Sequence, residues 1–149
     1  MTTYEYRIVG RRLADIPETS GNTPEAAARY VTTQCFKEED AWRESAFAVF
    51  LDRKNRIMGH MLISVGGPDS TVMDPAVVAK GAVGVLADGV IITHNHPAGD
   101  PAPSEHDIKG TRRLKLALDL FDIKLLDHII VGDRKAYSFH DERTFNIES

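Results

Sequence analysis

The sequence predicts an α/β domain of the layered α+β type, in which helices pack on a mixed β-sheet. Short apolar runs of strand length alternate along the chain with amphipathic segments that carry helix-capping residues. A chain of 149 residues with 42% hydrophobic content can form one domain with its own core. The single cysteine, Cys35, excludes a disulfide framework or a cysteine-rich zinc site within one chain.

The first half of the chain predicts strands around one helix. Residues 4–9 (YEYRIV) predict a short first strand. A helix follows, because Thr23 is placed to cap it and Pro24 takes its first position. Two apolar runs separated by the turn RKNR, residues 46–52 (AFAVFLD) and 57–65 (IMGHMLISV), predict a hairpin.

The second half predicts two further helices and three further strands. In chain order these are residues 74–89 (a weak helix interrupted by two glycines), 90–94 (VIITH), 104–121 (a helix), 124–132 (KLLDHIIVG) and 135–139 (KAYSF). The helix at 104–121 presents an apolar stripe at Ile108, Leu114, Leu118 and Phe121. The C-terminal residues HDERTFNIES predict a loose tail.

The net charge and the hydropathy of the sequence argue against nucleic acid and membranes as main partners. The formal net charge is −4 and the isoelectric point is about 5.8, whereas phosphate binding usually needs a concentrated basic face. Nucleic acid is therefore not expected as the main partner. The N-terminal residues lack the apolar core of a signal peptide, and no segment reaches the roughly 18 apolar residues of a membrane span. We expect a cytoplasmic protein without a membrane partner, and homo-oligomerisation stays open.

Metal-competent side chains are concentrated in the segment ITHNHPAGDPAPSEHD, which ends at Asp107. His94 and His96 follow an apolar strand, and the period of two of a strand places both imidazoles on one face. A loop with three prolines then turns the chain back, so that Asp107 in the first turn of the next helix can reach them. Two imidazoles and a carboxylate would form a tetrahedral zinc site with one open position.

Each part of this segment also has a plain structural interpretation. A His-x-His pair alone is often incidental. Ser104 and Asp107 form a Ser-x-x-Asp capping box, and a helix dipole favours an anion at this position. A site is favoured by the combination, because His-x-His-Pro-x-Gly and Ser-x-x-Asp at this separation would need several coincidences. The other histidines His60, His106 and His140 are interpreted as surface or packed residues.

The segment HNHPAGDPAPSEHD resembles the metal-binding signature of the JAB/MPN (JAMM) metalloproteases, in particular their RadC-like bacterial branch. The resemblance extends over residues 41–139 and includes FLDRKNR, LLDHIIVG and YSF. It implies a JAB/MPN-like fold of cytidine-deaminase-like architecture. We expect a domain over residues 41–140, an extension over 1–40 packed on it, and a tail over 141–149.

The same resemblance assigns roles to five residues. His94, His96 and Asp107 correspond to the metal ligands of the family, with Zn²⁺ as the cofactor. Glu44, just ahead of SAFAVFLD, corresponds to the catalytic glutamate, which would accept a proton from water and pass it to the leaving amine. Ser104 corresponds to the serine near the metal, which would stabilise the developing oxyanion. Without the resemblance, Glu44 would be read as an ordinary surface glutamate.

These residues predict a zinc-dependent hydrolase, a metallopeptidase or isopeptidase that cleaves an amide bond in a peptide or protein substrate. Two alternatives stay open: a role in DNA repair or another nucleic-acid-associated role, and a metal-stabilised interaction module without catalysis. RadC-like chains usually read His-Pro-Arg-Glu before the weak helix, but this sequence reads DPAV, so that arginine has no counterpart. Only residues 1–40 precede the matching part, too few for a helix-hairpin-helix region and a linker, so DNA binding through that region is not expected.

Overall fold

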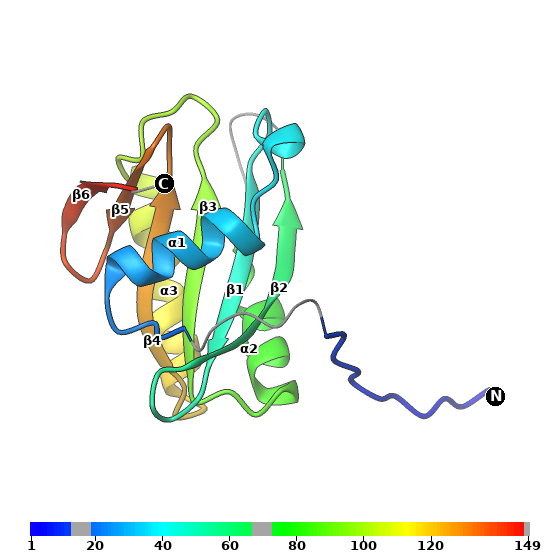
Figure 1. The fold of residues 1–149 in the computed structure, drawn as a ribbon. Helices are drawn as coiled ribbons and strands as arrows, with labels where there is room; N and C mark the ends of the chain where they lie inside the picture. Colours follow the sequence, from blue (N-terminus) through cyan, green and yellow to red (C-terminus); the bar gives the residue numbers. More distant parts are fainter. Residues whose placement is uncertain (13–18, 67–72, 148–149) are drawn as a thin grey trace.

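A mixed six-stranded sheet packed by three α-helices forms the part of the chain that the structure, a computed structural model, describes: residues 1–12, 19–66 and 73–147 (Figure 1). The strands are β1 (Ser45–Leu51), β2 (Ile57–Val65), β3 (Gly89–Asn95), β4 (Lys124–Val131), β5 (Lys135–Ser138) and β6 (Arg143–Asn146). The helices are α1 (Pro24–Gln34), the 3-10 turn η1 (Glu38–Asp40), α2 (Pro75–Gly84) and α3 (Glu105–Asp119). This arrangement confirms the predicted α+β class.

The order of the strands brings distant segments to one end of the sheet. The order is β2-β1-β3-β4-β5-β6, with β3 and β4 parallel and the other pairs antiparallel. A parallel pair needs a crossover connection, and α3 supplies it. Because β1 runs against β3, with Ala46 opposite His94, the beginning of β1 lies beside the end of β3.

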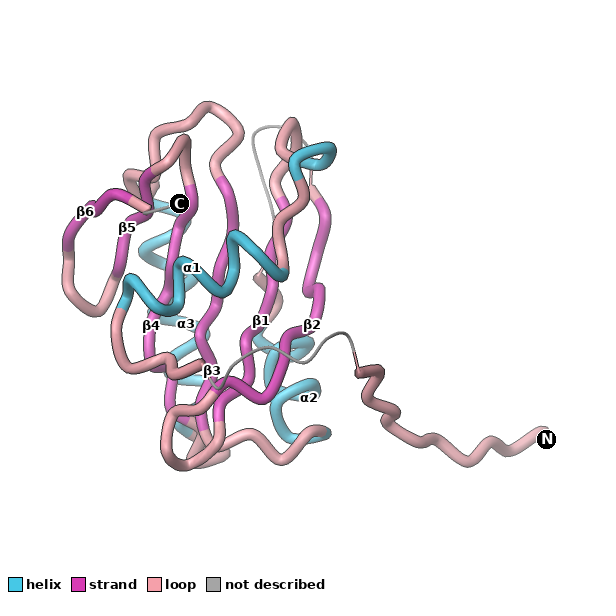
Figure 2. Tube along the Cα trace, viewed as in Figure 1, coloured by secondary structure: helices cyan, strands magenta, loops and turns pink. Residues whose placement is uncertain are grey.

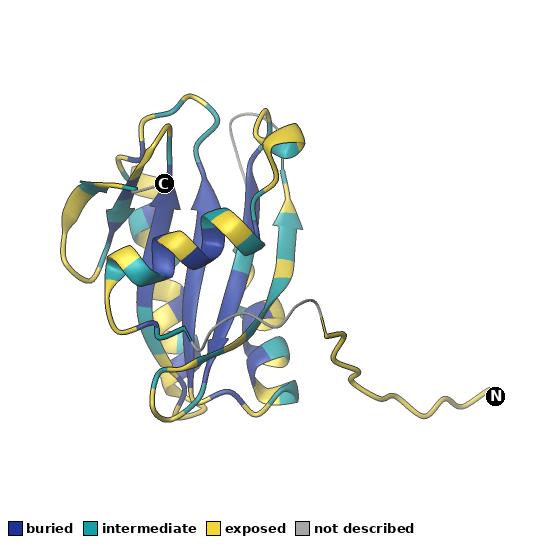
Figure 3. Cartoon of the chain, in the orientation of Figure 1, coloured by how far each residue is buried: buried dark blue, intermediate teal, exposed yellow. Residues whose placement is uncertain are grey.

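The sheet is covered on both faces, and its central strands are buried (Figure 3). Helix α1 lies across one face, whereas α2 and α3 lie on the other (Figure 1). The apolar cluster on the α1 side includes Val31 and Ile91, and that on the α2–α3 side includes Ile92, Leu114 and Leu118. Alternate residues of β3 therefore supply the two clusters, as the period of two of a strand requires.

Side-chain caps fix where the helices begin. The Thr23 hydroxyl accepts a hydrogen bond from the Ala26 amide at 3.2 Å, and Pro24 is the first residue of α1, as predicted. Ser104 begins α3 with a complete capping box. Figure 2 shows that loops join the elements at both ends of the sheet. None of the described helices is long and apolar enough to cross a bilayer.

Three local predictions are wrong. Residues 4–9 form no strand: they extend from the body without a neighbouring strand (Figure 1) and are exposed. Residues 143–146 of the expected loose tail form β6, because they pair with β5. Phe121 lies beyond the end of α3, and 55% of its surface is exposed. The expected division at residues 40 and 140 stays a prediction, and residues 13–18 and 148–149 of its outer parts lie outside the described residues.

Candidate metal centre

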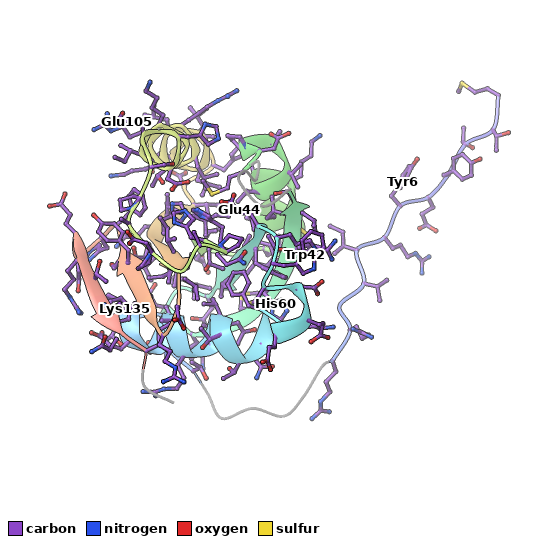
Figure 4. All side chains as sticks on the ribbon, turned by 90° about the horizontal axis from the view of Figure 1, so that it is seen from above. Tyr6, Trp42, Glu44, His60, Glu105 and Lys135 are labelled. Atoms are coloured by element: carbon purple, nitrogen blue, oxygen red, sulfur yellow. The ribbon has the colours of Figure 1, made fainter. Side chains whose placement is uncertain are left out.

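One end of the sheet gathers the residues that the motif predicts. His94 is the last residue but one of β3, His96 follows that strand directly, and Asp107 lies in the first turn of α3. The His96 amide still donates to the Val131 carbonyl at 2.8 Å, so β4 continues to hold the chain beyond β3. Figure 4 looks onto this end and shows Glu44 on the side of the strands that faces α3.

The three predicted ligands converge on one point. The Nε2 atoms of His94 and His96 are 3.1 Å apart. His94 Nε2 lies 3.2 Å from Asp107 Oδ1, and His96 Nε2 lies 3.2 Å from Asp107 Oδ2. His94 and Asp107 are buried, and His96 is half-buried. These side chains could hold a metal ion.

A chain of hydrogen bonds fixes the proton of His94 on the side away from this point. The Thr111 hydroxyl lies 2.6 Å from the Asp107 carbonyl, which can only accept, so Thr111 donates there. Thr111 Oγ1, 2.6 Å from His128 Nδ1, therefore accepts the His128 proton. Burial lowers the pKa of His128 well below its ordinary value, so the ring is neutral and its Nε2 carries a lone pair. That lone pair accepts from His94 Nδ1 at 2.8 Å, so in the neutral tautomer of His94 the proton is on Nδ1 and Nε2 carries a lone pair.

His96 is oriented in the same way by its own loop. Its Nδ1 lies 2.9 Å from the Asp100 carbonyl, an acceptor, so Nδ1 carries the proton of the neutral ring. When both rings are neutral, their Nε2 atoms and the Asp107 carboxylate thus face one another with lone pairs. Three acceptors at 3.1–3.2 Å repel unless a cation lies among them.

The donor set and its spacing fit zinc. Two atoms bound to zinc at 2.0–2.1 Å with tetrahedral angles lie about 3.3 Å apart, and the three spacings here are close to that value. Two neutral imidazoles and one carboxylate are also a ligand set of catalytic zinc sites, which keep one position open. The far nitrogen of His96 donates to the Asp100 carbonyl and that of His94 donates to His128, and hydrogen bonds on the far nitrogen orient metal-binding histidines.

Electrostatics at the site favour positive charge. In the protonated His96 ring, Nε2 donates a hydrogen bond to Asp107, which raises the pKa of His96 above its ordinary value, and the nearby charge of Glu44 acts in the same direction. Burial alone would raise the pKa of Asp107, but hydrogen bonds with His94 and His96 lower it well below its ordinary range. Asp107 is therefore an anion, and a proton or a metal ion competes for the same position.

Glu44 and Ser104, the predicted catalytic residues, lie at the same end of the sheet. Glu44 directly precedes β1 and is buried, with 9% of its surface exposed, so it is not the surface glutamate that composition alone suggests. The Ser104 hydroxyl accepts from the Asp107 amide at 3.1 Å, and the Ser104 amide donates to Asp107 Oδ2 at 2.9 Å. The capping interpretation of Ser104 is thus confirmed, and its hydroxyl proton is not used by the cap.

Three residues of this end have contacts that the sequence does not reveal. Thr111 and His128 form the hydrogen-bond chain behind His94. Asn95 lies between the two histidines, and its buried side chain contacts the backbone next to Glu44. The only signal in the sequence was the presence of His128 in LLDHIIVG. Trp42 does not pack: 62% of its surface is exposed, and the Arg43 guanidinium lies over its ring.

A hollow of about 920 Å³ opens on the opposite face of the sheet, toward α1. Phe36, Phe47 and His60 are among the residues that line it, and it reaches His96 and Pro97 at one edge. Glu44, His94 and Asp107 do not line it, so this hollow adjoins the metal centre only at His96. Figure 4 shows His60 on the side of α1, away from Glu44.

The fold and the site define an α+β domain of the JAB/MPN type, and comparison with known proteins agrees. Residues 21–144 match the family model described as RadC-like JAB domain. The match covers most of the chain, so the chain belongs to the RadC-like JAB domain family. The resemblance stated from the sequence is confirmed.

Several curated relatives are similar over much of this chain. A UPF0758 protein of Coprothermobacter proteolyticus is 38% identical over 142 residues, which cover 91% of this chain and 59% of the relative. One of Desulforudis audaxviator is 40% identical over 142 residues, covering 92% and 60%. One of Geobacter sulfurreducens is 46% identical over 100 residues, covering 67% and 44%. The chain thus spans about half the length of these relatives, and their names state no activity.

Proposed function

We propose that this domain is a zinc-dependent hydrolase of the JAMM type that cleaves an amide bond in a peptide or protein, as a peptidase or isopeptidase. The observation that carries the proposal is the set of three lone-pair donors on His94, His96 and Asp107, fixed by hydrogen bonds behind them, with a buried carboxylate nearby. Bound zinc would lower the pKa of a coordinated water to about 7 and polarise a substrate carbonyl.

Glu44 is the residue suited to move the proton. Its charge contributes to the raised pKa of His96, which indicates that its carboxylate lies near the ligands. In the proposed reaction Glu44 accepts a proton from the attacking water and later donates it to the leaving amine. Burial keeps this carboxylate away from bulk water, where its charge would be screened.

Ser104 is the residue suited to stabilise the oxyanion. Its oxygen accepts the Asp107 amide proton, so its own proton can be donated to the substrate carbonyl oxygen as negative charge develops there. Ser104 lies at the exposed N-terminus of α3, where a substrate can reach it. The exposed N-terminus of a helix also favours a developing negative charge.

The test compares Glu44→Gln with Glu105→Gln, a matched control for an exposed glutamate on the outer side of α3 (Figure 4). The probe is a library of internally quenched fluorescent peptides, and zinc content is measured by elemental analysis. We expect the zinc-loaded wild type and the control to cleave, and Glu44→Gln to retain zinc while kcat falls about 10²- to 10⁴-fold.

Two outcomes would contradict the proposal. Cleavage by Glu44→Gln at the wild-type rate would remove Glu44 from the mechanism. A zinc-loaded wild type that cleaves no peptide of the library, yet gains thermal stability from zinc, would instead favour the metal-stabilised interaction module.

A further inference from the structure

Asn95 makes two hydrogen bonds to the backbone on either side of Glu44. Its Oδ1 accepts from the Ser45 amide at 2.8 Å, and its Nδ2 donates to the Arg43 carbonyl at 3.0 Å. Asn95 is buried, with 9% of its surface exposed, and it lies in β3 between the two histidines. One side chain therefore connects the strand of the candidate ligands to the peptide units that flank the candidate base.

These two hydrogen bonds lie where the regular pairing of β1 with β3 ends. The pairing of β1 with β3 begins at Ala46 opposite His94, so Glu44 lies beyond the last pair. On its other side, the Glu44 carbonyl accepts from the Gly66 amide at 2.8 Å. The Asn95 amide takes the place of a further rung of the ladder, because it offers one acceptor and one donor to the neighbouring strand.

We infer that Asn95 is a positioning residue, which sets the place of the Glu44 carboxylate relative to His94 and His96. The inference rests on the proposed function. The side chains of His94 and Asn95 point to opposite faces of β3, so a single strand holds the ligands on one face and the backbone of the base on the other. A base must lie within hydrogen-bond reach of the proton that it removes, and a misplacement of about 1 Å can lower a rate about 100-fold.

Two substitutions distinguish the contributions of the two Asn95 hydrogen bonds. Asn95→Asp keeps the shape and the acceptor for the Ser45 amide, but it loses the donor to the Arg43 carbonyl. Asn95→Ala loses both. The matched control is Thr93→Val, because Thr93 lies on the same face of β3, is fully buried and donates to the Ile129 carbonyl of β4 at 2.8 Å, away from Glu44.

The first measurement does not depend on activity. Zinc affinity is determined by competition with a chromophoric chelator for wild type, Glu44→Gln, Asn95→Ala and the double variant. In the protein that retains Asn95, Glu44→Gln should weaken zinc binding about 3- to 10-fold, because it removes a negative charge near the ligands. In the Asn95→Ala background the same change should have a clearly smaller effect, since the carboxylate is displaced. An equal effect in both backgrounds would overturn the inference.

The second measurement is steady-state cleavage of the quenched peptides. We expect kcat of Asn95→Ala to fall about 10- to 100-fold with KM little changed, and Asn95→Asp to fall less. Thr93→Val should lose stability while keeping the kcat of the wild type. A purely structural Asn95 would behave like Thr93, with kcat per folded molecule unchanged, and that result would also overturn the inference.

The two hypotheses fail in different ways. A zinc-loaded wild type without any cleavage would refute the proposed function, while a difference between the two backgrounds in zinc affinity would still support the positioning of Glu44 by Asn95. Conversely, an active wild type with unaffected Asn95 variants would refute the inference alone.

Discussion

The two faces of β3 carry different chemistry at the same end of the sheet. On the α3 side the apolar row ends in His94, and its Nε2 points into a space shared with two other candidate ligands. On the α1 side the corresponding row ends in Thr93 and Asn95, whose polar atoms bind backbone groups of β4 and of the chain around the start of β1. Thr93, His94 and Asn95 are all buried.

The difference shows how burial of polar groups can serve two purposes. Hydrogen bonds from side chain to backbone satisfy Thr93 and Asn95 and tie strands together. On the other face, hydrogen bonds satisfy only the far nitrogens of the imidazoles, and lone pairs remain directed at one point. Buried lone pairs that face one another destabilise the domain unless a cation joins them, so they indicate function rather than packing.

The largest effect should follow from removing the lone pairs themselves. His94→Ala combined with His96→Ala leaves one of the three candidate ligands, and we expect zinc affinity to fall by more than about 100-fold, since three ligands share a binding free energy on the order of 10 kcal/mol. Elemental analysis and chelator competition measure this change. His60→Ala, a histidine whose Nδ1 lies 2.9 Å from the Tyr30 hydroxyl on the other face, is the control and should bind zinc as the wild type does. One zinc per chain in the double variant would refute the site.

A smaller effect should follow from disturbing the bonds behind the ligands. Thr111→Val removes the oxygen that accepts the His128 proton. That proton can then move to the other His128 nitrogen, and His94 would carry its own proton on Nε2, facing the metal. We expect zinc affinity to fall about 10- to 100-fold, measured by the same competition. Thr111→Ser restores the oxygen and should restore affinity; equal affinities for the valine and serine variants would show that the proton of His94 is fixed by something else.

The smallest effect concerns the buried Cys35 on the α1 face, because burial disfavours its charged thiolate form. Burial raises the pKa of Cys35 to about 12, whereas a thiol in an unfolded chain ionises near 8.5. Above that pH the unfolded state loses a proton that the folded state retains, so stability falls as pH rises. We expect the free energy of unfolding to decrease by up to about 1.4 kcal/mol per pH unit between roughly pH 8.5 and pH 10, above which Tyr30, whose pKa burial also raises to about 12, adds to the slope. Urea unfolding with a chelator present should show this slope in the wild type; if Cys35→Ala has the same slope, the thiol is not its source.

Local signals in the sequence predicted most of the fold. The hairpin of β1 and β2 follows from two apolar runs around a turn, and the helix starts follow from Thr23 and Ser104. These features depend on residues close together in the chain. Residues 4–9 have the alternation of a strand but no partner, whereas residues 143–146 become a strand because β5 offers its edge. Alternation alone cannot tell these two cases apart, since the partner decides.

The ligands of the candidate site could be predicted from the sequence, but the residues that orient them and Glu44 through hydrogen bonds could not. Imidazoles and a carboxylate are chemically distinctive, so their spacing in one segment indicates a metal. The contacts of Asn95 and Thr111 depend on which backbone atoms the fold places opposite them, and ordinary polar residues give no sign of that in a sequence. The proton position of His94 depends on three residues from two elements, and only the structure relates them.

The order in which the parts of the domain assemble follows from how far apart they lie in the chain. His96 and Asp107 are 11 residues apart, whereas Ser45 and Asn95 are 50 residues apart. Short loops close at a smaller entropic penalty than long ones, and local contacts form sooner during folding. The β3–α3 segment can therefore gather its ligands before β1 joins the sheet. A chain in which β3 and α3 have met but β1 has not yet paired would hold the metal ligands together without Glu44. Metal binding would then precede catalysis at the site.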